Sequence, residues 1–118
     1  MDEIFAPSER IRKQKDFFHL YKEGKRYRGK YFTLIYLSSA SNVSRMAVVV
    51  SKKVGNAVKR NKIKRWIRTI FRRNKPLLKH PIDIVIIIKK EILEASWLKL
   101  REDYFTAIKS ISKNNSSP

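Results

Sequence analysis

Basic side chains recur at helical spacing in the segment KRNKIKRWIRTIFRR, residues 59–73. On a helical wheel, one arc holds Lys, Arg and Asn and the opposite arc holds large apolar side chains. No acidic residue balances the charges, and like charges one turn apart repel by about 0.2–0.5 kcal/mol per pair. Phosphate oxygens would remove this repulsion and would accept hydrogen bonds from arginine and asparagine. The pattern therefore predicts a polyanion-binding helix, with a polar arc of Asn61, Lys62, Lys64, Arg65, Arg68, Arg72 and Arg73 and an apolar arc of Ile63, Trp66, Ile67, Ile70 and Phe71.

Two lysines precede this helix in the segment SKKVGNAV, residues 51–58. Lys52 and Lys53 end an apolar stretch, and Gly55 then leads into the start of the helix. Backbone N–H groups at a helix start and neighbouring lysines together favour an anion. The lysines precede the glycine and the spacing GxxxxGK[ST] is absent, so this is not a nucleotide-binding P-loop.

The remaining titratable residues do not form the pattern of a protein nuclease, which needs metal-binding carboxylates or a pair of histidines. Asp16, Glu23 and Asp83 are widely spaced, and His19 and His80 are isolated. We therefore predict no catalytic and no metal-binding residue, and we interpret Asp16 as an acid in the first turn of a helix.

The net charge of +18 is concentrated in the middle of the chain. Residues 24–82 contain 17 Lys and Arg and no Asp or Glu, whereas the remainder contains 11 basic and 10 acidic residues. A block of one sign that also contains apolar periodicity indicates a folded surface for a polyanion, nucleic acid first and an anionic membrane second. A disordered basic arm is the alternative, and the apolar content of the same block argues against it.

Several protein classes are excluded by composition. The chain of 118 residues is the size of one domain, and it has no cysteine for disulfides, thiol nucleophiles or Cys-rich zinc sites. Its longest apolar run, residues 84–88, is too short to span a membrane, and residues 1–10 do not resemble a secretory signal. We therefore expect a cytoplasmic protein without a membrane partner.

The elements that must position the basic helix follow from periodicity and from turn residues. We expect helices at about 14–23, 56–74 and from Ser96 onward, with Gly24 ending the first and Ser96 capping the last. We expect strands at 27–37, divided near Gly29, and at 46–50 and 82–88, the last two buried on both faces. Residues 38–44 form a polar turn. The ends, about 1–12 and 113–118, are expected to be flexible.

This α-β-β-β-α-β-α order predicts one α/β (α+β) domain over residues 1–118, in which helices pack on a mixed sheet as a two-layer sandwich. The strand–helix–strand unit at 46–88 suggests a parallel pair joined by a crossover.

The segment from Ser51 to Arg72, SKKVGNAVKRNKIKRWIRTIFR, resembles the bacterial ribonuclease P protein family. In that family a strand ends in Ser-Lys-Lys, a glycine loop follows, and the helix carries Arg-Asn-x-x-Lys-Arg-x-x-Arg. The resemblance extends to residues 15–17, Gly24 and residues 83–85. Two departures are Lys62, where the family often has arginine, and residues 87–90, where it often has Ala-Arg-Lys.

The resemblance implies the small subunit of a ribonucleoprotein endonuclease that removes the 5′ leader from precursor tRNA. It implies that a catalytic RNA with bound Mg²⁺ performs the hydrolysis, that the protein holds no cofactor alone, and that no protein partner is required. It also implies a left-handed crossover, contrary to the usual rule.

Site residues follow from the same resemblance. Contact with the RNA subunit is expected from Lys52, Arg60, Asn61, Lys62, Lys64, Arg65, Arg68 and Arg72. Contact with the single-stranded leader is expected from Phe17, Tyr21, Lys53, Tyr36 and Lys89, because aromatic stacking tolerates any base sequence. For Phe17 and Tyr21 the alternative is a place in the hydrophobic core.

A ribosomal or general RNA-binding protein without associated catalysis shares the charge, size and aromatic content and is the alternative function. A DNA-binding architectural protein and a membrane-surface protein fit less well, since there is no helix-turn-helix pattern and the apolar helix face is needed for the core.

Overall fold

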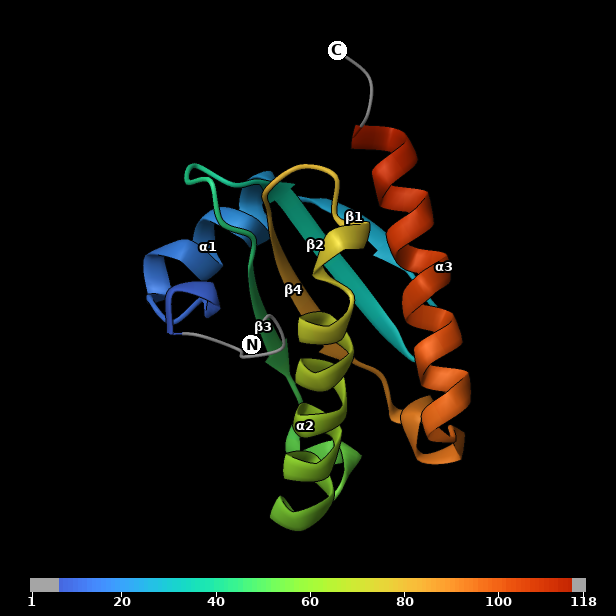
Figure 1. Ribbon diagram of the computed structural model, residues 1–118. Helices are drawn as coiled ribbons and strands as arrows, with labels where there is room; N and C mark the ends of the chain where they lie inside the picture. Colours follow the sequence, from blue (N-terminus) through green and yellow to red (C-terminus); the bar gives the residue numbers. More distant parts are fainter. Residues whose placement is uncertain (1–6, 116–118) are drawn as a thin grey trace.

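The computed structural model describes residues 7–115 and contains a four-stranded sheet with helices on both faces (Figure 1). The helices are α1 (Gln14–Glu23), α2 (Ala57–Arg73) and α3 (Trp97–Asn115), and the strands are β1 (Lys25–Arg28), β2 (Phe32–Ser38), β3 (Arg45–Val49) and β4 (Ile82–Ile88). Short 3₁₀ turns lie at η1 (Pro7–Glu9), η2 (Lys52–Val54), η3 (Lys75–Leu77) and η4 (Lys90–Glu94). The expected order of helices and strands is confirmed.

The sheet has the order β1-β2-β4-β3 and is mixed. β2 is antiparallel to β1 and β4, whereas β3 and β4 are parallel and are connected through α2. β4 has a neighbour on each side, which explains why its run of Ile and Val is almost entirely buried. β3 was expected to be buried on both faces, but Ala47, Val48 and Val49 are only half-buried. The physical reason is that β3 is an edge strand, which has one neighbour instead of two.

Alternate side chains of the sheet enter two separate hydrophobic clusters, as the two-residue period of a strand requires. The larger cluster lies under α2 and α3 and includes Phe32 and Ile84 from the sheet and Ile67 and Tyr104 from the helices. This face forms the expected sandwich of sheet and helices. The smaller cluster lies on the opposite face, where Leu20 of α1, with Ile11, packs against Ile35 and Val85 of the sheet. Helix α1 therefore adds a partial third layer.

The first described residues contact the edge of the sheet and the segment after α2. Ile11 is buried, and its backbone N–H donates to the carbonyl of Met46 at 3.2 Å. Glu9 forms an ion pair with Lys75. Flexibility of the ends stays a prediction: Arg10 and Ile11 lie at the edge of β3 and residues 113–115 belong to α3, while residues 1–6 and 116–118 lie outside the described residues.

The helix boundaries have local causes. The side chain of Asn56 accepts from the N–H of Lys59 at 3.0 Å at the start of α2, and Ser96 accepts from Lys99 at 3.2 Å at the start of α3. Gly24 follows α1 as expected, but its φ of −72° is not left-handed. A Cβ at this position would lie 2.5 Å from the carbonyl oxygen of Leu20, so glycine is needed for close packing instead.

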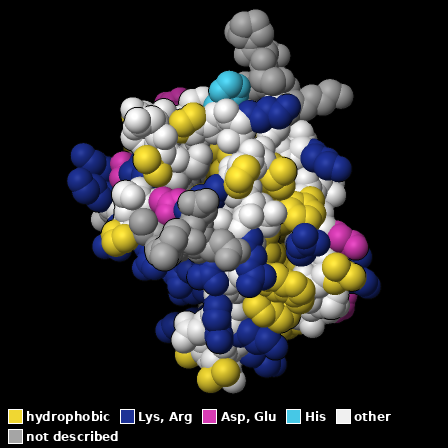
Figure 2. Space-filling view, in the orientation of Figure 1, with side chains coloured by type: hydrophobic (Ala, Val, Ile, Leu, Met, Phe, Trp, Pro, Cys, Tyr) yellow, Lys and Arg dark blue, Asp and Glu magenta, His cyan; other side chains and the backbone are white. Residues whose placement is uncertain are grey.

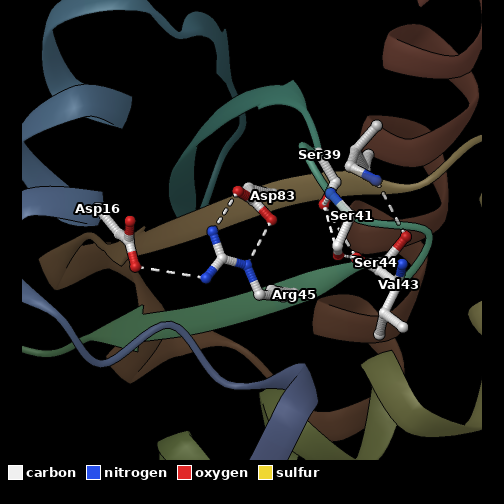
Figure 3. A network of polar contacts seen from close by, with 8 residues as sticks. Asp16, Ser39, Ser41, Val43, Ser44, Arg45 and Asp83 are labelled. Carbon is white, nitrogen blue, oxygen red and sulfur yellow. Dashed lines mark hydrogen bonds and ion pairs between the residues drawn. The ribbon is translucent and has the colours of Figure 1, made fainter.

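An arginine ties α1 to the parallel strands (Figure 3). Arg45 donates to both carboxylate oxygens of Asp83, at 3.0 and 2.7 Å, and to Asp16 at 3.3 Å. The hydrogen bond to Asp83, ahead of the charges of the two carboxylates, raises the pKa of Arg45. Asp16 is therefore a structural residue, which agrees with its interpretation as a helix acid. In the adjoining turn, the hydroxyl groups of Ser39 and Ser41 both donate to the carbonyl of Val43.

The buried phenol of Tyr104 gives a stability prediction. Its hydroxyl makes no hydrogen bond with any described residue, and burial raises its pKa above the ordinary value. A buried polar group without a partner costs about 1–3 kcal/mol. We therefore expect Tyr104→Phe to raise the free energy of unfolding by about 1 kcal/mol at pH 7, measured by urea denaturation.

The same variant has a predicted pH dependence. Above pH 10 the phenol ionises in the unfolded chain but stays protonated in the folded one, so its contribution to stability falls by about 1.4 kcal/mol per pH unit. The variant should escape this loss, and its advantage should grow above pH 10. A variant less stable than the parent protein at pH 7 would show that the hydroxyl is satisfied.

Candidate nucleic-acid interface

One row of side chains on α2 lines a polar groove of about 510 Å³. The row consists of Asn61, Arg65, Arg68 and Arg72, which lie one turn apart along the helix, and Arg10 and Thr69 complete the lining. The opposite side of α2 is buried in the core through Ile63, Ile67, Ile70 and Phe71. The expected docking of this helix is confirmed.

Guanidinium groups from two parts of the chain are crowded in this groove. Partial burial, and then the charge of Arg10, lower the pKa of Arg68, although its side chain is still exposed to solvent. The Nε of Arg72 is buried and has no hydrogen-bond partner among the described residues. Crowded guanidinium groups and a buried donor without an acceptor favour an anionic oxygen in this groove.

Other predicted RNA-binding residues lie outside the groove lining. Arg60 and Lys64 are half-buried on the flank of α2, and Lys52 is exposed in η2. The ammonium group of Lys62 lies 4.9 Å from the ring centroid of Trp66. Lys62 therefore lies on the side of α2 that faces α3, because Trp66 contacts Trp97 of that helix.

Sequence reasoning missed Arg10. It lies in an irregular segment without periodicity, and the parallel bridge between Arg10 and Met46 at the edge of β3 helps to bring it beside α2. A pattern confined to the α2 segment contains no signal for a residue contributed by a distant part of the chain.

The loop before α2 does not depend on an unusual glycine conformation. Gly55 is extended, and a Cβ there would meet only the flexible side chain of Lys59 at 3.0 Å. Lys53 is exposed in η2, the next element along the chain after β3. Anion contact at this loop remains a prediction.

The two predicted leader-binding aromatics of α1 lie together, with ring centroids 6.4 Å apart. Tyr21 is 38% exposed, which excludes a purely core role. Phe17 is half-buried and packs against the cluster on this face of the sheet, and Val49 and Ile87, which pack against the same cluster, are also half-buried. This face of the sheet is therefore only partly covered, and apolar surface remains accessible next to α1.

The other two aromatic or basic side chains predicted to bind the leader, Tyr36 and Lys89, are less accessible than Tyr21. Tyr36 is 3% exposed and belongs to the core under α2 and α3, whereas its neighbour Ile35 faces α1. The expectation for Tyr36 is wrong because successive residues of a strand face opposite sides. Lys89 is half-buried at the end of β4, and its ammonium group donates to the carbonyl of Gly29 at 2.6 Å.

Within residues 7–115, no three His, Asp or Glu side chains could hold a metal ion together. Over the same residues, no helix is long and apolar enough to span a bilayer.

Comparison with known proteins decides the family. The family model described as Ribonuclease P matches residues 5–112 of this chain. The chain belongs to the ribonuclease P protein family. Proteins of this family bind RNA, process tRNA and form part of an endoribonuclease ribonucleoprotein.

Individual members of the ribonuclease P protein family are similar over most of their length. The ribonuclease P protein component of Thermotoga maritima is 43% identical over 94 residues, which is 80% of each chain. The component from Syntrophus aciditrophicus is 49% identical over 82 residues, which is 70% of this chain and 69% of the relative.

The fold agrees with solved ribonuclease P proteins. The T. maritima structure has a TM-score of 0.79 at 38% identity and covers 86% of this chain and 96% of its own. The Staphylococcus aureus structure has a TM-score of 0.81 at 32% identity, and the match covers 87% of this chain and 94% of the S. aureus chain. The resemblance inferred from residues 51–72 and the mixed α+β fold are thus confirmed.

Proposed function

We propose that this chain binds the catalytic RNA of ribonuclease P through the groove of α2 and the 5′ leader of precursor tRNA through the face of α1. In this way it assists Mg²⁺-dependent removal of the leader. The observation that carries the proposal is the convergence of Arg10, Arg65, Arg68 and Arg72 on one groove, where the Nε of Arg72 is buried without a partner among the described residues.

The groove suits a phosphate backbone. Guanidinium groups form paired, charge-assisted hydrogen bonds to phosphate, and Asn61 can donate from its amide. Phosphate contacts position a protein on nucleic acid without reading its bases, so a structured RNA would be held by the spacing of its phosphates.

The α1 face suits a single strand of variable sequence. The exposed ring of Tyr21 and the half-buried ring of Phe17 offer stacking surfaces, and the exposed Lys53 offers attraction to phosphate. Lys89 is a weaker candidate because its ammonium group already donates to Gly29.

These side chains support a division of chemistry between the protein and the RNA. The described residues bind and orient RNA, and they do not fit a protein-held metal site. We assign the bound Mg²⁺ and the hydrolytic step to the RNA subunit, with no catalytic residue in the protein, and this role implies a cytoplasmic location.

The test is reconstitution. RNA-free protein should leave precursor tRNA uncut, whereas protein added to a bacterial catalytic RNA at low Mg²⁺ should restore accurate 5′ maturation, and chelation of Mg²⁺ should abolish it. The RNA alone at the same Mg²⁺ is the control. Cleavage by the protein alone would assign the chemistry to the protein. Binding of the RNA without any increase in maturation would favour a general RNA-binding protein.

A further inference from the structure

An aromatic strip lies between α2 and α3, on a different side of α2 from the arginine groove. Trp66 of α2 and Trp97 of α3 meet edge to face, with ring centroids 5.8 Å apart. Figure 2 shows hydrophobic side chains gathered over the region between these two helices. Trp66, Trp97 and Phe105 are all half-buried, so parts of their rings contact solvent.

The strip continues into a groove of about 680 Å³ between η3 and α3. Apolar lining comes from Leu77, Phe105 and Ile108, and polar lining from Asn74, Lys79, Lys109 and Ser112. From Trp97 to Lys109, α3 rises by about 18 Å, since each residue adds 1.5 Å. The strip and the groove together are long enough for several nucleotides of a single strand.

Cations lie beside two of the three rings and along the groove. The ammonium group of Lys62 lies 4.9 Å from the Trp66 centroid, and the guanidinium of Arg101 lies 4.5 Å from the Phe105 centroid. Lys79 and Lys109 flank the groove. An arginine stacked on a ring extends the flat surface on which a base can stack and also carries a charge for its phosphate.

The charge decides what kind of partner fits. A second copy of this chain would bring another molecule of net charge +18 against the same lysines and arginines, and the two would repel. A neutral apolar peptide would bury these cations without partners. A single-stranded polyanion with flat bases satisfies both the rings and the cations.

We propose that the α2–α3 surface, defined by Lys62, Trp66, Trp97, Arg101, Phe105 and Lys109, is a second binding site for single-stranded RNA. It lies apart from the Arg65–Arg68 groove, and it is on the opposite side of the sheet from α1. RNA bound here would stack on the rings and place phosphates beside the flanking cations.

The protein carries its own probe for this site, because Trp66 and Trp97 are its only tryptophans. We would titrate the full chain with a ten-nucleotide, unstructured single-stranded RNA and measure tryptophan fluorescence. Stacking should quench the emission in a saturable way. Inorganic polyphosphate of equal charge, which has no bases, should bind without this quenching. RNA that binds with unchanged tryptophan emission would overturn the proposal.

Two variants separate stacking from general charge. Phe105→Leu keeps an apolar side chain but removes one ring, and it should weaken the affinity by roughly 5- to 150-fold, as expected for one lost stacked base. Arg101→Gln with Lys109→Gln changes only exposed residues, so it tests the site even if the first variant fails to fold. For this double variant, the slope of log affinity against log salt concentration should become less steep by about 1.4.

The matched control removes two exposed charges from the edge strand β1, which do not belong to the proposed surface, as Lys25→Gln with Arg28→Gln. It should change the affinity less than threefold. If the control lost as much affinity as Arg101→Gln with Lys109→Gln, net charge alone would attract the RNA, and the proposal would be wrong. Sedimentation that showed a dimer dissociated by Trp97→Ala would likewise overturn it, because the surface would then join two copies.

Discussion

The double variant Arg65→Ala with Arg68→Ala is expected to bind ribonuclease P RNA about 100-fold more weakly at 0.15 M salt. Both side chains line the α2 groove. A hydrogen bond to a charged group is worth about 1.5 kcal/mol, which is close to tenfold for each arginine. The slope of log affinity against log salt concentration should also become less steep by about 1.8, since each lost phosphate contact reduces the slope by about 0.9. Filter binding over a range of KCl concentrations measures both quantities.

Replacement of Arg65 and Arg68 by alanine should leave the stability of the fold nearly unchanged. Arg65 and Arg68 are exposed, and relief of the repulsion between Arg68 and Arg10 offsets any lost contact. We expect the free energy of unfolding to change by less than about 0.5 kcal/mol for Arg65→Ala. Lys25→Ala with Arg28→Ala is the matched control for charge. If that control weakened binding as strongly, the groove would not be the contact site.

The parts of the fold that could be predicted have strong internal periodicity. β4 contains an unbroken apolar run at residues 84–88, and the apolar arc of α2 identifies the buried side of that helix without any knowledge of its neighbours. Because burial of one arc exposes the other, the position of Arg65 and Arg68 on the surface follows from the same pattern.

What the sequence did not predict depends on neighbours in space. The half-burial of β3 follows from its place at the sheet edge, which the apolar run at residues 46–50 does not encode. Arg10 lines the groove because its segment bridges to Met46, far away in the sequence. Lys62 lies at the border of the polar arc, and its contact with Trp66 decides which surface it serves.

The α1 face shows how finely a site prediction depends on register. Tyr36 and Ile35 are adjacent, yet one is in the core under α2 and α3 and the other faces α1. A shift of one residue in an expected strand therefore exchanges an aromatic for an aliphatic side chain on the face that would receive the leader. The pairing of Phe17 and Tyr21 does not depend on the register of the sheet, because the two residues lie one turn apart on the same helix.

The proposed contact between Tyr21 and the leader predicts a large loss of affinity for precursor tRNA. Tyr21→Ala should weaken binding of precursor tRNA to the reconstituted complex by roughly 5- to 150-fold if one base stacks on the ring. Affinity for mature tRNA should stay nearly unchanged, because the mature product has no leader. Tyr21→Phe retains the ring and should restore most of the affinity. The measurement is equilibrium binding of both tRNAs at fixed salt and Mg²⁺.

A neighbouring aromatic supplies the control for this variant. Phe18 is also on α1 and is 67% exposed, more than the 38% of Tyr21, but it does not belong to the cluster that contains Phe17. Phe18→Ala should therefore leave the ratio of precursor to mature affinity unchanged. Because Tyr21 is exposed, its replacement should also avoid the loss of about 3–5 kcal/mol that follows removal of a buried aromatic. Equal losses for precursor and mature tRNA in Tyr21→Ala would remove this ring from the leader site, since the loss would then reflect a contact common to both ligands.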